Sequence, residues 1–260
     1  MSGPMGSMRK LVAAGGLIYK AVMGALFAAL AVWPDPVARD GPAQMACDEA
    51  LLSAAEIPVL RIFRWAGPWV SAGYFVPWEE ACAARPDLPV CRRWTGGGIV
   101  IHEGDFTFSL VAPRREEWAR QRPESYRTLH EALTKALQAV GCAATLVADR
   151  QPASAQCFAG PVQHDVLLGA RKIAGGAQRR SKAGLLHQGS LQLSGLPGDW
   201  VAQLAGRLAE QTLDWQPVAG FEDQVLALVN EKYAQPGFLR PEAARGQNSL
   251  QSGAMAKPSG

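Results

Sequence analysis

A glycine-rich segment flanked by arginine and histidine is the densest chemical signal in the chain. It reads RRWTGGGIVIH and contains Arg93, Gly96, Gly97, Gly98 and His102. Glycines let the backbone approach a ligand closely, so that its N–H groups can hold a phosphate or a carbonyl oxygen. The spacing matches neither the phosphate-binding loop of ATPases nor the glycine pattern of dinucleotide-binding folds. On this evidence alone the segment is either a turn between strands or the wall of a binding site.

A second segment combines a lysine with small residues. Lys172 is followed by Gly175 and Ala177, and residues 166–198 contain five lysines and arginines but no acidic residue. One interpretation is a solvated basic hairpin. The other is a positive surface that attracts an acidic macromolecule or holds an anionic group. With small residues after it, Lys172 can reach from a strand into a pocket rather than into solvent.

Cys157 is the cysteine best placed for chemistry, because it follows a loop rather than lying within a helix pattern. A thiolate is a good nucleophile, and a neighbouring lysine or histidine lowers the pKa of such a thiol. A lone cysteine can equally be structural. Neither a CxxC pair nor a Cys/His metal pattern occurs among the five cysteines. We therefore expect free thiols, a reducing compartment and no metal site.

The composition is that of a globular protein with a sizeable core. Of 260 residues, 48% are hydrophobic and 19% are charged, which excludes a collagen-like, coiled-coil or largely disordered chain. The net charge of +3 is too small to indicate nucleic-acid binding. We expect one or two domains from this length.

The elements that must position these residues follow from the hydrophobic periodicity. Strands and helices come in runs rather than in strict alternation, which favours an α+β fold over a doubly wound parallel sheet. Expected helices span residues 45–54, 123–140, 200–208 and 221–233. Expected strands span residues 29–33, 59–65, 70–74, 90–94, 98–101, 106–111, 162–168, 172–177 and 185–193. The strands at 98–101 and 106–111 flank a short turn and are predicted to form a hairpin.

The N-terminus contains an apolar run of 23 residues, from Leu11 to Trp33, with the single charge Lys20. An export or membrane segment is one interpretation, although a lysine within the run is costly in lipid. A misassigned translation start is another, and a third assigns only the end of the run to a first strand. We favour the last two together. The expected organisation is an extension at 1–29, a catalytic domain at 30–235 and a polar tail at 236–260, in a cytoplasmic protein.

Taken in this order, the motifs resemble those of the biotin/lipoate protein ligase catalytic family. Residues 92–102 are similar to its RRxTGGGxVxH element, and residues 172–180 to its KxxGxAQxR element. Residues 43–52 resemble its MAxDExLL opening helix, and residues 60–65 with 68–73 resemble the strand pair that follows. The biotin-ligase GRGRxG loop is absent, so the lipoate and octanoate side of the family is the better match.

The resemblance implies an octanoyltransferase of the cysteine-dependent branch, without a cofactor. Cys157 would take octanoyl from acyl carrier protein as a thioester and pass it to a lysine of a lipoyl domain or a glycine-cleavage H-type protein. Lys172 would be the second catalytic residue. The residues expected to bind substrate are Arg93, Gly96, Gly97, Gly98, His102, Gly175 and Ala177. Acyl carriers and lipoyl domains are typically acidic, so the basic stretch would attract them. Nucleic acid and membrane are not expected partners.

Three other functions, two of them catalytic, fit the same motifs. An ATP-dependent lipoate–protein ligase would use ATP and Mg²⁺, with Lys172 on a phosphate or carboxylate. A non-catalytic relative would only bind lipoyl domains or acyl carriers. An amidotransferase between two lipoyl proteins would share the cysteine thioester. Only about 27 residues follow Tyr233, so we expect the accessory domain common in the ligases to be absent unless it is a separate chain.

Two positions depart from the family pattern. His187 precedes Gln188, where the octanoyltransferases carry the reverse order, and this weakens any role carried over to His187. Glu103 follows His102 where an aspartate is commoner, which leaves the role of Glu103 open.

Overall fold

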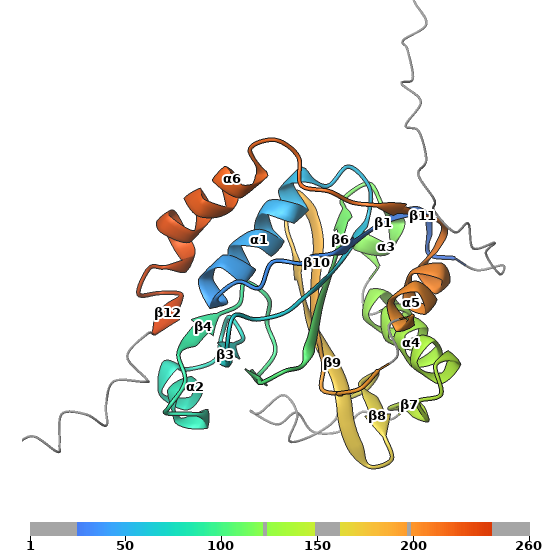
Figure 1. Cartoon of the computed structure of the whole chain (residues 1–260), viewed down its shortest axis with the longest axis horizontal. Coiled ribbons are helices and arrows are strands. Elements are labelled where there is room, and N and C mark those ends of the chain that lie inside the picture. Colours follow the sequence, from blue (N-terminus) through green and yellow to red (C-terminus); the bar gives the residue numbers. More distant parts are fainter. Residues whose placement is uncertain (1–24, 122–123, 149–161, 197–198, 241–260) are drawn as a thin grey trace, which may run out of the picture.

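The computed structural model describes residues 25–121, 124–148, 162–196 and 199–240, and these form two sheets with helices packed around them (Figure 1). The expected α+β class is confirmed. The larger sheet has the strand order β11-β1-β2-β6-β10-β9-β8-β7. Its strands are β11 (Ala209–Asp214), β1 (Phe27–Pro34), β2 (Val59–Phe63), β6 (Phe106–Pro113), β10 (Gly184–Leu191), β9 (Arg171–Arg180), β8 (Val166–Leu168) and β7 (Ala144–Leu146). β1 runs parallel to both neighbours, and all other pairs are antiparallel.

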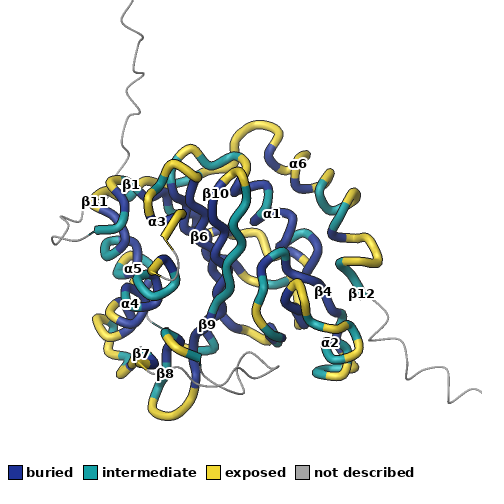
Figure 2. The backbone as a smooth tube through the Cα atoms, turned by 180° about the vertical axis from the view of Figure 1, so that it is seen from behind, coloured by how far each residue is buried: buried dark blue, intermediate teal, exposed yellow. Residues whose placement is uncertain are grey.

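Helices cover both faces of the larger sheet. α4 (Glu124–Ala139) and α5 (Trp200–Leu208) pack on the face that receives Leu60 and Leu110. α1 (Gly41–Ala54) and α6 (Phe221–Leu228) lie over the other face, which receives Val59 and Val111. Adjacent strand residues point to opposite faces, so these neighbours feed two separate cores. This two-sided cover explains why β2 is buried along its whole length. The same holds for β10 (Figure 2).

The smaller sheet has the order β12-β4-β3-β5 and packs against the short helix α2 (Trp78–Ala84). Its strands are β12 (Leu239–Arg240), β4 (Val90–Arg92), β3 (Trp69–Ala72) and β5 (Ile99–His102). Val70, Val90 and Ile99 form its own apolar cluster. The glycine-rich segment is therefore the connection between two strands of this smaller sheet.

The predicted hairpin of residues 98–101 and 106–111 is wrong. Both strands exist, but β5 pairs with β3 in the smaller sheet, whereas β6 pairs with β2 and β10 in the larger one. The turn at Gly104, where φ is +92°, carries the chain from one sheet to the other. The two sheets thus meet directly after His102.

The boundaries of several elements differ from expectation. β1 begins at Phe27, and β12 pairs with β4 beyond Pro236, so ordered structure extends past both ends of the expected domain 30–235. The strand expected at 162–168 is reduced to Val166–Leu168. The helix expected at 221–233 is α-helical only as α6, which ends at Leu228. The π-helical turn Val229–Tyr233 follows it. The remaining helix, α3 (Glu117–Arg120), precedes α4.

Within the described ranges, no helix has both the length and the apolar character needed to cross a bilayer. Most of the apolar run at the N-terminus lies outside those ranges.

Candidate active site

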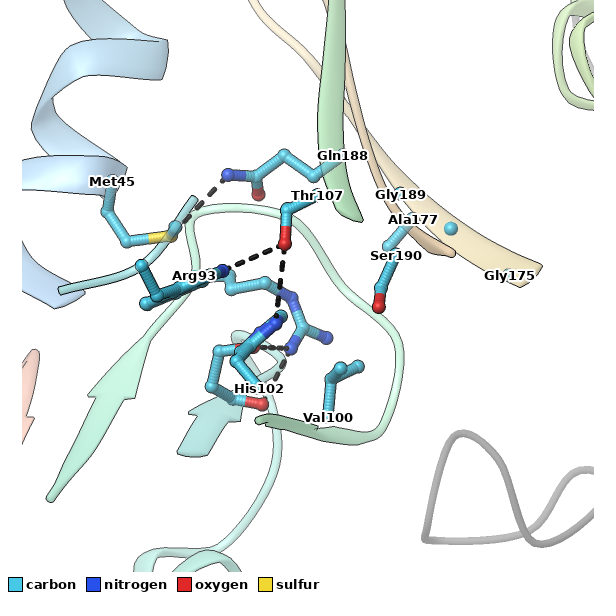
Figure 3. Close-up of a pocket in the computed structure, with 13 residues that line it drawn as sticks. Met45, Arg93, Val100, His102, Thr107, Gly175, Ala177, Gln188, Gly189 and Ser190 are labelled. Carbon is cyan, nitrogen blue, oxygen red and sulfur yellow. Dashed lines mark hydrogen bonds between the residues drawn. The ribbon is translucent and has the colours of Figure 1, made fainter. Parts of the chain in front are cut away.

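A pocket lies where the two sheets meet, with about 380 Å³ of empty space counted to its open mouth (Figure 3). Residues of α1, β3, β5, β6, β9 and β10 contribute to its wall. The lining residues are Met45, Trp65, Ser71, Arg93, Val100, His102, Thr107, Gly175, Gly176, Ala177, Gln188, Gly189 and Ser190. Four of the residues expected to bind substrate, Arg93, His102, Gly175 and Ala177, are among them. Much of the lining is apolar, as an acyl chain would require.

Arg93 holds the glycine-rich segment in place. Its guanidinium donates to the backbone oxygen and to Oγ of Ser71, both at 2.7 Å, and to the carbonyls of Gly96 and Gly98 at 3.1 and 2.8 Å. Gly97 has φ of +80°, a conformation that side chains other than glycine rarely adopt. The three glycines therefore fold around Arg93 and do not themselves line the pocket.

His102 lies in a chain of buried polar groups. Its Nε2 is 2.8 Å from Ser71 Oγ, and its Nδ1 is 2.9 Å from Asp105 Oδ2. Thr107 and Ser190 also donate hydroxyl hydrogen bonds to Asp105 Oδ2, at 3.0 and 2.6 Å. The indole of Trp65 stacks on the imidazole at 4.0 Å between ring centroids. These contacts fix both the position and the orientation of the His102 ring.

A second chain of buried hydrogen bonds also reaches the glycine-rich segment. Thr95 donates its hydroxyl to Gln188 Oε1 at 2.7 Å, and the Gln188 amide donates to Asp48 Oδ2 at 2.7 Å. Asp48 in turn accepts from Arg61 at 2.7 Å and from Ser109 at 2.8 Å. Gln188, unlike its neighbour His187, lines the pocket. The order His187-Gln188 thus places an amide at the pocket wall.

Lys172 lies directly behind the pocket wall. A Cβ at Gly175 would come within 2.6 Å of Lys172 Cε and 2.8 Å of Nζ, so the glycine leaves room for the lysine side chain. The ammonium is 2.7 Å from Asp165 Oδ2, and both side chains are buried. Asp165 also accepts from the Tyr126 hydroxyl at 2.9 Å and from the Val162 N–H at 2.7 Å. A buried charge needs such partners to offset its lost hydration.

Two buried histidines pack beneath this ion pair without lining the pocket. The ring centroids of His130 and His187 lie 5.3 Å apart, and each ring contacts that of Tyr126. Burial lowers the pKa of His130 to about 4 and that of His187 well below its ordinary value. Gln178 donates to His187 Nδ1 at 3.2 Å. His187 therefore has a structural role, packed between its neighbours.

The cysteines divide into those the structure describes and Cys157, which lies outside the described residues. Cys47, Cys82, Cys91 and Cys142 are free thiols, and none of the four lines the pocket. Burial raises the pKa of Cys47 and of Cys91 to about 12, which leaves both as unreactive thiols at neutral pH.

The basic stretch is less exposed than a solvated hairpin would be. Arg180 donates to the backbone oxygens of Ala119 and Gln121 and to Ser125, so it fastens the start of α4 to β9. Arg179 lies over the rings of Tyr74 and Trp94. Arg171 and Lys182 are exposed and remain available to attract an acidic partner.

Glu103 forms a surface ion pair with Arg85 at 2.8 Å, away from the imidazole. The carboxylate that supports His102 comes instead from Asp105, two residues further along the chain.

Sequence reasoning missed Ser71, Asp105, Tyr126 and Gln188 as parts of the site. Ser71 reads as an ordinary residue of a buried strand, and Tyr126 falls on the apolar stripe of α4. The available signal for Asp105 was its position three residues after His102, next to a glycine turn. Ser71 and Gln188 contact partners 31 and 140 residues away, which no local pattern encodes.

Comparison with known proteins shows which family the sequence matches. The family model of the lipoyl protein ligase A/B catalytic domain matches residues 40–234. The octanoyltransferase LipM of Moorella thermoacetica is 34% identical over 183 residues, which are 64% of this chain and 65% of the relative. The LipM protein of Staphylococcus aureus is 30% identical over 171 residues, covering 59% and 62%. The chain thus spans somewhat less than two thirds of the length of these curated relatives.

Two solved structures share the fold. Protein Ta0514 of T. acidophilum, solved with bound lipoic acid, superposes with a TM-score of 0.61 at 21% identity, covering 80% of this chain and 96% of that one. A lipoate-protein ligase A bound with ATP superposes with a TM-score of 0.59 at 19% identity, covering 84% and 99%.

Proposed function

This chain belongs to the lipoyl protein ligase A/B catalytic domain family, and we propose that it is an octanoyltransferase acting through a cysteine thioester. Octanoyl passes from acyl carrier protein to Cys157, and then to a lysine of a lipoyl domain or a glycine-cleavage H-type protein. The matched relatives carry the name octanoyltransferase. The donor thioester supplies the energy of the transfer, so the reaction needs neither ATP nor a metal.

The observation that carries the proposal is the Lys172–Asp165 pair behind the apolar pocket. A fixed buried ammonium beside the pocket wall favours a nearby thiolate and stabilises negative charge that develops on an acyl oxygen. Much of the pocket lining is apolar, which suits a hydrocarbon chain. Lys172 is therefore the proposed partner of Cys157.

The other proposed binding residues shape this wall. Gly175 and Ala177 keep the β9 side of the pocket free of large side chains, and Gly97 packs closely on Ala177, where a Cβ at position 97 would lie 3.3 Å from that of Ala177. Arg93 acts by holding Gly96, Gly97 and Gly98 in their fold.

The free thiols of the described cysteines suit a reducing compartment, and we propose a cytoplasmic location.

Intact-mass spectrometry after mixing the protein with octanoyl-acyl carrier protein, without ATP, tests this proposal. We expect one octanoyl group on the wild-type protein and on Cys142→Ser, and none on Cys157→Ala. An adduct that appears only with ATP and free acid would replace the proposal with the ligase reaction. Octanoyl on the Cys157→Ala variant at the wild-type rate would contradict the role of Cys157.

A further inference from the structure

The second step of the proposed reaction needs a proton acceptor. The acceptor lysine arrives as an ammonium, since its ordinary pKa is about 10.4, and it must lose a proton before it can attack the thioester. Lys172 is itself an ammonium bound to Asp165, and the oxygens of Asp165 already accept from Lys172, Tyr126 and Val162. Neither group of this pair is placed to take that proton.

Resting on the proposed function, we infer that Asp105, His102 and Ser71 form the general base for amine attack. Of the described residues that line the pocket, His102 is the one imidazole, and Ser71 lines it as well. Asp105 Oδ2 can only accept, so the hydrogen of neutral His102 lies on Nδ1 and Nε2 presents its lone pair to the Ser71 hydroxyl. This order of groups is the one that abstracts protons in serine hydrolases.

The contacts around Asp105, His102 and Ser71 suit proton transfer rather than nucleophilic attack by Ser71. Arg93 donates to Ser71 Oγ at 2.7 Å while the hydroxyl faces His102, so the oxygen is already held as an acceptor. Burial by itself would raise the pKa of Asp105. The neighbouring His102 and the hydrogen bonds from His102, Ser190 and Thr107 outweigh burial and lower that pKa. An ionised Asp105 stabilises the imidazolium that forms when His102 gains a proton.

In this step the acceptor nitrogen loses two protons and gains the acyl group. One proton of the acceptor ammonium passes to Ser71 Oγ as the Ser71 hydroxyl proton passes to His102 Nε2. The neutral amine then attacks the acyl carbon, so that a C–N bond forms and the C–S bond to Cys157 breaks. A second proton moves from the nitrogen to the departing Cys157 thiolate. His102 returns its proton to solvent, leaving an amide and a free thiol.

Separate measurement of the two half-reactions tests the assignment. For His102→Gln and Asp105→Asn we compare each transfer rate with the rate of acyl-enzyme formation in the same variant, because His102 also lines the pocket. Transfer from acyl-enzyme to the lipoyl-domain lysine should fall by about 10²–10⁴, the usual contribution of a general base. Transfer to hydroxylamine, which is largely uncharged at neutral pH, should stay within a few-fold. His164→Asn, a histidine outside the pocket lining, is the matched control and should leave all three rates unchanged.

The outcomes distinguish this inference from the reaction on which it rests. Equal losses with lysine and hydroxylamine would indicate a merely structural role for His102 and overturn the assignment. Unchanged lysine transfer in both variants would overturn it as well. An octanoyl ester on Ser71 of the Cys157→Ala variant would make Ser71 a nucleophile instead. A wild-type protein that forms no acyl-enzyme would overturn the proposed function together with this inference.

Discussion

Lys172 owes its orientation to a glycine three residues further along the same strand. The alkyl chain lies where a side chain at position 175 would begin, so the spacing of Lys172 and Gly175 has a steric cause. The ammonium that results is buried and tied to Asp165. At the scale of single residues, the catalytic proposal depends on this clearance and on this ion pair.

Gly175→Ala tests whether Lys172 needs the space beside position 175. The added methyl carbon would lie 2.6 Å from Lys172 Cε, closer than carbon atoms approach, so the lysine must move. We expect acyl-enzyme formation to fall at least tenfold while the protein remains folded, as measured by quenched-flow intact mass and circular dichroism. Gly237→Ala, where nothing lies within 4 Å, is the control and should match wild type. A fully active Gly175→Ala protein would show that the position of Lys172 does not matter.

Lys172→Met tests the ion pair. It leaves the Asp165 carboxylate buried without its cation, which should lower the free energy of unfolding by roughly 3–5 kcal/mol in urea titrations. The double variant Lys172→Met/Asp165→Asn removes that charge and should recover much of the stability. It should recover none of the acylation rate. Recovery of both would make the pair structural only.

At the scale of elements, the glycine-rich segment is fixed from two sides. Arg93 joins it to β3 through Ser71, and Thr95 joins it to β10 and α1 through Gln188 and Asp48. A segment with three glycines would otherwise have much conformational freedom to lose. The arginine and the threonine of the motif are thus explained as the anchors of this connection.

A double-mutant cycle measures one of these anchors. Thr95→Val and Gln188→Leu each break the 2.7 Å hydrogen bond between β10 and the segment, so their stability losses should not add. We expect a coupling energy of about 1 kcal/mol, the usual value for a buried hydrogen bond between neutral groups. Thr95→Val combined with Ser53→Ala, at an exposed position near the end of α1, should be additive. A coupling near zero for the first pair would contradict the anchoring role.

Local patterns predicted most elements but not their partners. Alternation located β2, β6 and β10, and the apolar stripe located α4, because both signals lie within one segment. The hairpin at residues 98–111 failed because the turn after His102 changes sheets, and a turn sequence does not say which sheet follows. Likewise His102 and Lys172 were found through motifs, whereas Ser71 and Gln188 depend on contacts between distant segments.

At the scale of the whole molecule, helices on both faces of the larger sheet place polar groups deep inside. His130 and His187 are fully buried and neutral beneath the Lys172–Asp165 pair. In the folded protein burial holds the pKa of His130 at about 4, whereas in the unfolded chain it is about 6.5. Between these values the unfolded state binds more protons, so stability must fall as the pH falls.

Unfolding at several pH values checks this property. Between pH 6.5 and pH 4 we expect His130 alone to remove about 3 kcal/mol of stability, since one unit of pKa difference is worth about 1.4 kcal/mol. Urea midpoints should therefore be constant above about pH 7 and decline from pH 6.5 to pH 5, before most carboxylates titrate. The decline should be smaller in His130→Gln. A midpoint independent of pH over this range would contradict the burial of a neutral imidazole.

Complete turnover without ATP tests whether Cys157 carries octanoyl from the acyl carrier to the acceptor lysine. Octanoyl-acyl carrier protein, a lipoyl domain and the protein are mixed without ATP, and the mass of the lipoyl domain is followed over time. We expect one octanoyl group on the acceptor lysine with wild-type protein and none with Cys157→Ala or Lys172→Met/Asp165→Asn. Acceptor modified only when ATP and free acid replace the acyl carrier, or modified equally by the Cys157→Ala variant, would contradict it.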